Sequence, residues 1–200
     1  MMHLLLNAGA NVNMQDKEGR TALMNAAHFW GEHGVGMMRL LVDAGANVNM
    51  QTKDGWTALM LAARFGVNAV GMMRLLIDAG ADVNKQTKDG WTALMVAARF
   101  GVNAAGMIYV LAYAGVDLNK KNNSGKTAID LASNDKIKEY IQNIYAEIRR
   151  TTFAGNVLMS GRGPGPAEIC DWRAYIPYDL WCEIFDYAVS KKMIEIHFVN

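Results

Sequence analysis

The feature that most constrains this sequence is a block of residues that is repeated almost unchanged along the chain. Gly-x-Thr triplets begin at Gly19, Gly55, Gly90 and Gly125, which gives steps of 36, 35 and 35 residues. A repeat period in this range is typical of solenoids, which are built from stacked supersecondary units. Because a single unit of this size cannot bury its own apolar face, the sequence predicts that neighbouring units stack.

Each copy predicts two short antiparallel helices followed by a polar turn. Thr57 stands at an N-cap position before Ala58 to Arg64, a run of good helix formers. A second helix follows, and Gly80 stands where a glycine ends such a helix. The apolar stripe of this second helix consists of Met72, Leu75, Leu76 and Ala79. The polar stretch from Ala81 to Gly90 then predicts a projecting turn.

The pattern G-W-T-A-L-M-L-A-A-R-F-G, followed by M-M-R-L-L-I-D-A-G-A-D-V-N, resembles the ankyrin repeat over roughly the first three quarters of the chain. The family's usual T-P-L-H is T-A-L-M here, so the proline that starts the helix and the histidine that bridges turns are absent. We therefore expect turns that are less rigid than in the family consensus. The expected fold is all-α: an ankyrin-repeat solenoid of helix-turn-helix units with projecting turns, plus a small C-terminal helical segment.

The repeats also define the expected domain organisation. We expect a partial repeat at 1–14, full repeats at 15–49, 50–84 and 85–119, a C-terminal capping repeat at 120–150, a linker at 151–168 and a helical segment at 169–200. The chain thus begins at the second helix of a unit. The linker is indicated by the absence of a helical stripe and by the run G-R-G-P-G-P.

Two departures from the regular unit lead to structural expectations. The segment Val67 to Val70, which recurs as Val102 to Ala105, lengthens the gap between the helices by two residues, so these loops should protrude. In the last unit, Asn122 to Ala132 keeps the turn and the first helix. Asn134 to Arg149 has isoleucines on one side and charged residues on the other, which is typical of a capping helix.

The composition limits the functional classes. The 200 residues carry a formal net charge of +1, so the chain lacks the broad basic field that nonspecific nucleic-acid binding needs. The four histidines and two cysteines have neither metal-ligand nor catalytic spacing, so we expect no enzyme, metal or cofactor. We expect no transmembrane helix and no signal peptide. The expected location is the cytoplasm, or the host cytoplasm for a protein of a virus or an intracellular bacterium.

Stacking leaves one continuous open surface, the concave face made of turn tips and first helices, which we expect to bind a target protein. The candidate contact residues are Trp56, Arg64, Phe65, Trp91, Arg99 and Phe100, with His28, Phe29 and Trp30 in the corresponding stretch of the first copy. Tryptophan and arginine are common energetic anchors of interfaces. In the alternative interpretation, the phenylalanines pack under the long loops and the tryptophans only support the turns.

The family resemblance has one further implication. Asn49 and Asn84 match the turn asparagine that an intracellular asparaginyl hydroxylase modifies in ankyrin repeats.

Residues 176–187, I-P-Y-D-L-W-C-E-I-F-D-Y, resemble the opening of an F-box. An F-box-like segment after ankyrin repeats is similar to the truncated, PRANC-like form found in viral ankyrin proteins. The resemblance implies a substrate adaptor that docks on the Skp-type subunit of a cullin-RING ubiquitin ligase. The docking residues would be Ile176, Pro177, Leu180, Ile184 and Phe185. The alternative is a plain ankyrin scaffold or inhibitor that binds one partner protein and uses its C-terminal helix as a structural cap.

Overall fold

The computed structural model describes residues 9–29, 34–65, 68–101 and 103–146 of the chain. The chain divides into two units, Met1–Thr152 and Phe153–Asn200, and every described residue belongs to the first. The linker and the C-terminal helical segment that the sequence predicts therefore lie outside the described residues. Within the described ranges, no helix has the length and apolar character needed to span a membrane.

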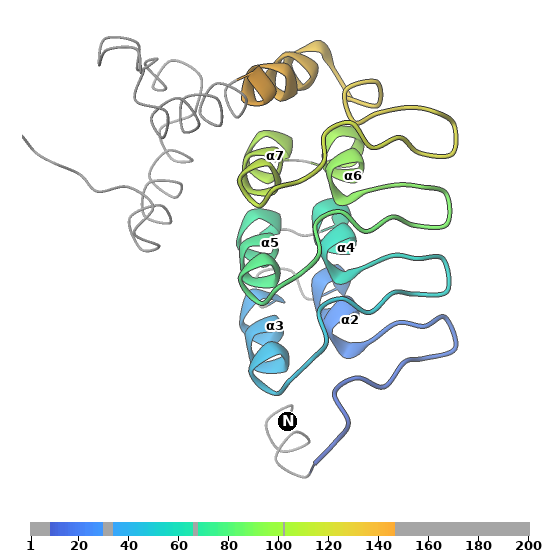
Figure 1. Cartoon of the computed structure of the whole chain (residues 1–200). Helices are drawn as coiled ribbons and strands as arrows, with labels where there is room; N and C mark the ends of the chain where they lie inside the picture. Colours follow the sequence, from blue (N-terminus) through green and yellow to red (C-terminus); the bar gives the residue numbers. More distant parts are fainter. Residues whose placement is uncertain (1–8, 30–33, 66–67, 102, 147–200) are drawn as a thin grey trace, which may run out of the picture. The chain divides into compact units, whose positions relative to one another are not determined.

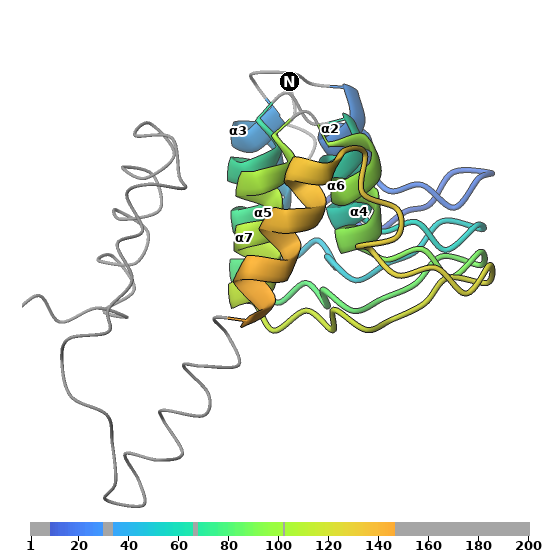
Figure 2. The ribbon, with the colours of Figure 1, turned by 90° about the horizontal axis from the view of Figure 1, so that it is seen from above.

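The described residues form pairs of helices that stack along the chain. The helices are α2 Ala22–Phe29, α3 Gly34–Asp43, α4 Ala58–Phe65, α5 Ala69–Asp78, α6 Ala93–Phe100 and α7 Ala104–Tyr113, and residues 135–146 are also helical. Helices α2, α4 and α6 form one column and α3, α5 and α7 a second, with the turns projecting from the side of the first column (Figure 1 and Figure 2). The described ranges contain no strand, and the predicted all-α repeat solenoid is confirmed.

Threonine side chains start the first helix of each regular unit. The Oγ1 atoms of Thr21, Thr57 and Thr92 accept hydrogen bonds from the backbone N–H groups three residues later, at 3.3, 3.3 and 3.2 Å. A cap of this kind contributes about 1 kcal/mol to stability. At the end of the second helix, Gly80 has a φ angle of +85°, the left-handed conformation expected of a glycine that terminates a helix.

The core runs without interruption from one unit to the next. Helix α4 packs against both α2 and α6, and α5 packs against both α3 and α7. The methionine that replaces the family's histidine fills this core in every regular unit, because Met24, Met60 and Met95 are all buried. The stability of such a stack comes largely from the interfaces between neighbouring units.

The prediction of protruding loops is wrong for Ala69 and Val70. Ala69 and Val70 lie in the first turn of α5 and are only 5% and 6% exposed. The helix begins here because the Oδ1 atom of Asn68 accepts a hydrogen bond from the backbone N–H of Gly71 at 3.4 Å. In the next unit, Ala104 likewise begins α7 and is buried. Ala69, Val70 and Ala104 therefore belong to the helix pairs, whereas Val67 and Val102 lie outside the described residues.

The last unit keeps the projecting turn, but the prediction of a regular first helix in it is wrong. Residues 128–131 form a single turn instead. The carboxylate of Asp130 accepts hydrogen bonds from the backbone N–H and from the hydroxyl of Thr127, at 2.9 and 2.7 Å. This side chain closes the turn locally, and only three residues separate the turn from the next helix, at 135–146.

The helix at 135–146 has the apolar face expected of a capping helix. Asn134 begins it, since its Oδ1 atom accepts a hydrogen bond from the backbone N–H of Ile137 at 3.0 Å. Ile141 and Ile144 are buried, whereas the intervening polar residues are exposed. The predicted amphipathic pattern is therefore confirmed over the described part of this helix.

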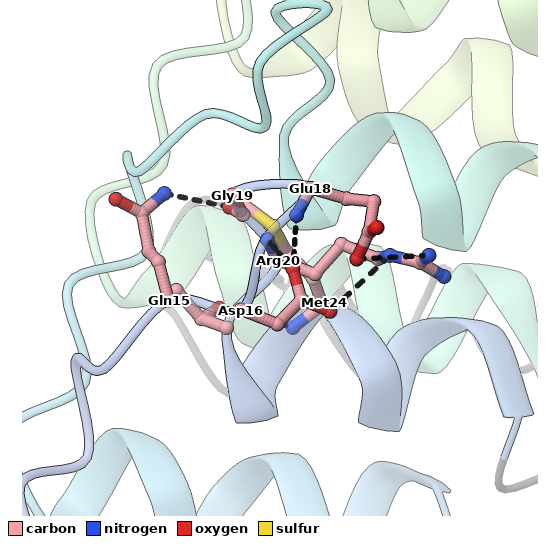
Figure 3. A network of polar contacts seen from close by, with 7 residues as sticks. Gln15, Asp16, Glu18, Gly19, Arg20 and Met24 are labelled. Atoms are coloured by element: carbon pink, nitrogen blue, oxygen red, sulfur yellow. Dashed lines mark hydrogen bonds and ion pairs between the residues drawn. The ribbon is translucent and has the colours of Figure 1, made fainter.

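The projecting turns are closed by their own hydrogen bonds and are also bonded to each other. In the first turn, the Oδ1 atom of Asp16 accepts from the backbone N–H groups of Glu18 and Arg20 at 3.0 and 2.8 Å (Figure 3). The backbone N–H of Lys53 in the second turn donates to the carbonyl of Glu18 at 2.9 Å. Each turn thus has side-chain and backbone bonds of its own where the family's bridging histidine is absent.

Candidate functional site

The exposed residues of α4 and α6 lie at the same two positions. The first six residues of each helix are buried, and only Arg64 with Phe65, and Arg99 with Phe100, are exposed. The two phenylalanine side chains are each 43% exposed. Residues 66–67 and 102, in the loops that follow these phenylalanines, lie outside the described residues, so packing of the rings beneath the loops stays an alternative. Large apolar side chains on the surface of a packed repeat are available for contact with another molecule.

The side chain of Arg64 joins two neighbouring units. Its guanidinium carbon lies over the ring of Phe65 at 4.9 Å and over the ring of Phe100, in the next unit, at 4.8 Å from the centroids. It also lies 5.4 Å from the ring centroid of Trp56, which precedes the same helix. Exposed cation–π contacts contribute about 0.5–1 kcal/mol each, so these three contacts hold the guanidinium group in place on the surface.

The same arrangement extends into the units on either side. The ring of His28 lies 4.3 Å from that of Phe65, centroid to centroid, and the guanidinium of Arg99 lies 5.9 Å from the ring centroid of Phe100. Trp91 stacks on Phe100 at 5.7 Å. We call this surface the cation–aromatic stripe, and it consists of His28, Trp56, Arg64, Phe65, Trp91, Arg99 and Phe100. The structure therefore brings all six predicted contact residues into one connected surface.

The two tryptophans lie between the turns and the stripe. Trp56 and Trp91 are half-buried against the core, and their backbone N–H groups donate to the Oγ1 atoms of Thr52 and Thr87 at 3.0 Å, which closes the turns. Their rings also contact Arg64 and Phe100 in the stripe. The tryptophans thus connect the turns to the exposed ends of the first helices.

The stripe carries its positive charge on its two arginines. The pKa of His28 is lowered, first by burial and then by the positive charges of Arg20 and Arg64, so this imidazole is neutral near pH 7. Arg20 itself is paired with carboxylates, at 3.5 Å from Asp16 and 3.7 Å from Glu18 (Figure 3). In the part of the chain that the structure describes, Arg64 and Arg99 form no such ion pair.

The sequence placed His28 in the stretch of the first copy that corresponds to the contact residues, and the structure places its ring against Phe65. His28 precedes Arg64 by 36 residues, which is the step between the first two units, so it occupies the arginine's position in its own copy. The side chain of Phe29 and residue Trp30 lie outside the residues whose side chains the structure describes.

The two asparagines predicted as hydroxylation sites link successive units. The amide nitrogen of Asn49 donates to the carbonyl of Gly80 at 2.9 Å, and its Oδ1 atom accepts from the backbone N–H of Asp82 at 2.7 Å. Asn84 forms the same pair of bonds with Gly115 and Asp117 in the next unit, at 3.2 and 2.7 Å. Sequence reasoning missed this structural role. Its signal is the recurrence of asparagine at steps of 36, 35 and 35 residues from position 13.

Two other sequence predictions concern metal ligands and the residues that would dock on a ligase subunit. Among the described residues, no three histidine, cysteine, aspartate or glutamate side chains gather as a metal site would require. The five residues predicted to dock on a ligase subunit all lie between positions 176 and 185, outside the described residues.

The comparison with protein families identifies the fold. The model described as "Ankyrin repeats (3 copies)" matches residues 1–87 and 67–151. The chain belongs to the ankyrin repeat family, in which the repeats serve as a protein–protein interaction module. The comparison with curated proteins finds no matching sequence.

Proposed function

We propose that the cation–aromatic stripe is the surface through which this ankyrin repeat protein binds its partner. The observation that supports this most strongly is the stacking of Arg64 between Phe65 and Phe100, because it fixes an exposed cation and two exposed rings across neighbouring units. Aromatic and arginine side chains that are held in place lose little conformational entropy when a partner binds. They are also the residue types that dominate interface energies.

Selection of peptides from a random display library on the wild-type chain tests this surface. The double variant Phe65→Ser, Phe100→Ser removes the exposed rings, and Met14→Ser is the matched control, since Met14 is a large apolar side chain that is 67% exposed elsewhere. We expect enriched peptides to bind the double variant at least about tenfold more weakly and the control as well as the wild type. Equal binding to all three proteins would show that the stripe is not the binding surface.

The finer proposal is that the chain is a substrate adaptor for a cullin-RING ubiquitin ligase in the cytoplasm. Its support is the F-box-like pattern at 176–187, placed after the repeats in the sequence. In this proposal, the repeats hold a target protein while Ile176, Pro177, Leu180, Ile184 and Phe185 dock on a Skp-type subunit. Ubiquitin transfer would take place on other subunits. The chain would act by raising the effective concentration of the target near them.

Titration calorimetry of the purified chain with a Skp-type subunit tests this adaptor role. We expect binding in the micromolar range or tighter, lost in the triple variant Pro177→Ala, Leu180→Ala, Ile184→Ala. The stripe variant Phe65→Ser, Phe100→Ser is the control and should still bind the subunit. If the wild type fails to bind subunits from plausible hosts, the chain is a plain scaffold or inhibitor.

Deletion of residues 169–200 separates the two roles by stability. An adaptor segment is dispensable for the repeats, so the truncated chain should unfold at the same temperature and lose only the ligase subunit. A structural cap covers apolar surface of the last unit, so its removal should lower the unfolding temperature or the solubility.

Hydroxylation of Asn49 and Asn84 is a separate proposal that rests on the family resemblance. Incubation of the folded chain with an asparaginyl hydroxylase and peptide mass spectrometry would test it, with a gain of one oxygen expected on each residue. No gain on either residue under conditions that modify a known ankyrin substrate would refute it.

A further inference from the structure

We propose that the partner presents an extended acidic segment to the stripe, with two carboxylates three residues apart that pair with Arg64 and Arg99. This inference rests on the proposed binding function of the stripe. It begins from a difference among the arginines. Arg20 in the first turn already pairs with Asp16 and Glu18, whereas Arg64 and Arg99 form no ion pair with any described residue.

The contacts of Arg64 use its charge and leave its hydrogen-bond donors available. The guanidinium group has five N–H donors in a rigid, planar fork. The aromatic rings attract its charge but do not accept strong hydrogen bonds from these donors. A carboxylate can accept two such bonds in the plane of the group. The three ring contacts of Arg64 and the ring contact of Arg99 are therefore compatible with a bidentate carboxylate at each guanidinium. Because the arginines are already positioned, pairing requires little further ordering.

The spacing of the arginines determines the spacing of the carboxylates. Arg64 and Arg99 occupy the seventh residue of α4 and of α6, two helices that pack directly against each other. Packed helices lie about 8–10 Å apart. In a polyproline-type extended segment, residues three apart lie on the same side at a separation of about 9 Å. The matching pattern is thus acid-x-x-acid, with Phe65 and Phe100 available to contact the residues in between.

The charges on the turn tips and of the whole chain favour a peptide over a nucleic acid. The exposed turn tips carry lysine next to aspartate in two successive units, at Lys53 with Asp54 and at Lys88 with Asp89. Alternating charges of this kind, together with a net charge of +1 for the whole chain, would repel a continuous polyanion as much as attract it. Two separate cations flanked by aromatic rings instead match two separate carboxylates with apolar residues between them.

Two charge-matched double variants test this partner chemistry on the peptides selected from the display library. Arg64→Gln, Arg99→Gln removes the two stripe cations, and Lys53→Gln, Lys88→Gln removes the same charge from the turn tips. We measure binding by fluorescence polarisation with a selected peptide, with its twin in which glutamine replaces each acid, and with a single-stranded oligonucleotide.

The expected result is enrichment of acid-x-x-acid peptides, at least about tenfold weaker binding to the arginine variant, and little change for the lysine variant. The glutamine twin should lose binding to the same extent. Peptides without acids that still require Phe65 and Phe100 would overturn this inference and leave the proposed binding surface intact. Peptides that depend on neither pair of residues would overturn both. Tighter binding of the oligonucleotide than of the acidic peptide would also overturn the inference.

Discussion

Replacing Asn84 by alanine should weaken the connection between two successive repeats. The Asn84 amide donates to the carbonyl of Gly115 at 3.2 Å and accepts from the backbone N–H of Asp117 at 2.7 Å. Asn119 stands at the same phase one unit later, but none of the described residues forms a hydrogen bond with its side chain. Asn119→Ala is therefore a matched control that changes the same atoms without removing a bond between units.

The size of the effect follows from the two bonds that are lost. A hydrogen bond contributes about 0.5–1.5 kcal/mol net, so the pair contributes about 1–3 kcal/mol. Both bonds of Asn84 are exposed, and water can replace the lost partners, which places the expected loss at about 1–2 kcal/mol. Asn119→Ala should change the free energy of unfolding by less than about 0.5 kcal/mol.

Urea denaturation followed by circular dichroism measures this difference. With a slope of about 2 kcal/mol per molar urea, Asn84→Ala should lower the midpoint by about 0.5–1 M. Asn119→Ala should leave the midpoint almost unchanged. Equal midpoints for the two variants would refute the reasoning, because they would mean that the amide bonds between repeats do not contribute to stability.

Two further predictions concern stability. Gly55→Ala should destabilise the chain by about 2–4 kcal/mol, because a Cβ at this φ of +84° would lie 2.8 Å from the Cα of Thr87. The Cβ of Gly80→Ala would meet no atom within 4 Å, so this variant should lose only about 1 kcal/mol of stability. Thermal unfolding of both variants measures the difference, and equal shifts in unfolding temperature would contradict the prediction. Burial, and secondarily Tyr113, raises the pKa of Tyr140 to about 12, so the stability linked to this group is complete below pH 10 and is lost as the pH rises towards 12. Tyr140→Phe should therefore unfold with less alkaline sensitivity than the wild type between pH 10 and 12, and an unchanged pH profile would contradict this.

Local structure was largely readable from the sequence. The threonine caps, the glycine that ends the second helix and the 35-residue step all act over a few neighbouring residues or repeat identically, so Thr57 and Gly80 could be assigned without knowledge of the fold. The errors arose where a local polar side chain determined a boundary. The side chain of Asn68 caps α5 within the predicted loop, so the helix begins earlier than expected. The side chain of Asp130 closes a turn where a helix was predicted.

The chemistry of the candidate site was only partly readable. The sequence predicted which side chains belong to it, because tryptophan recurs beside the turns and arginine recurs at the ends of the first helices. It could not predict that Arg64 lies between Phe65 and Phe100, since this contact joins residues 36 positions apart. It also could not predict that Arg20 is paired with carboxylates while Arg64 is not.

The sequence by itself determined the repeating unit and the class of fold, because caps, helix formers and terminating glycines depend on interactions within each copy. Only the tertiary structure determined the surface. The position of one unit relative to the next results from packing of the whole core, in which α4 contacts both α2 and α6. That packing brings Phe100 to Arg64 and Gly115 to Asn84, so the contacts between repeats exist only once the units have stacked.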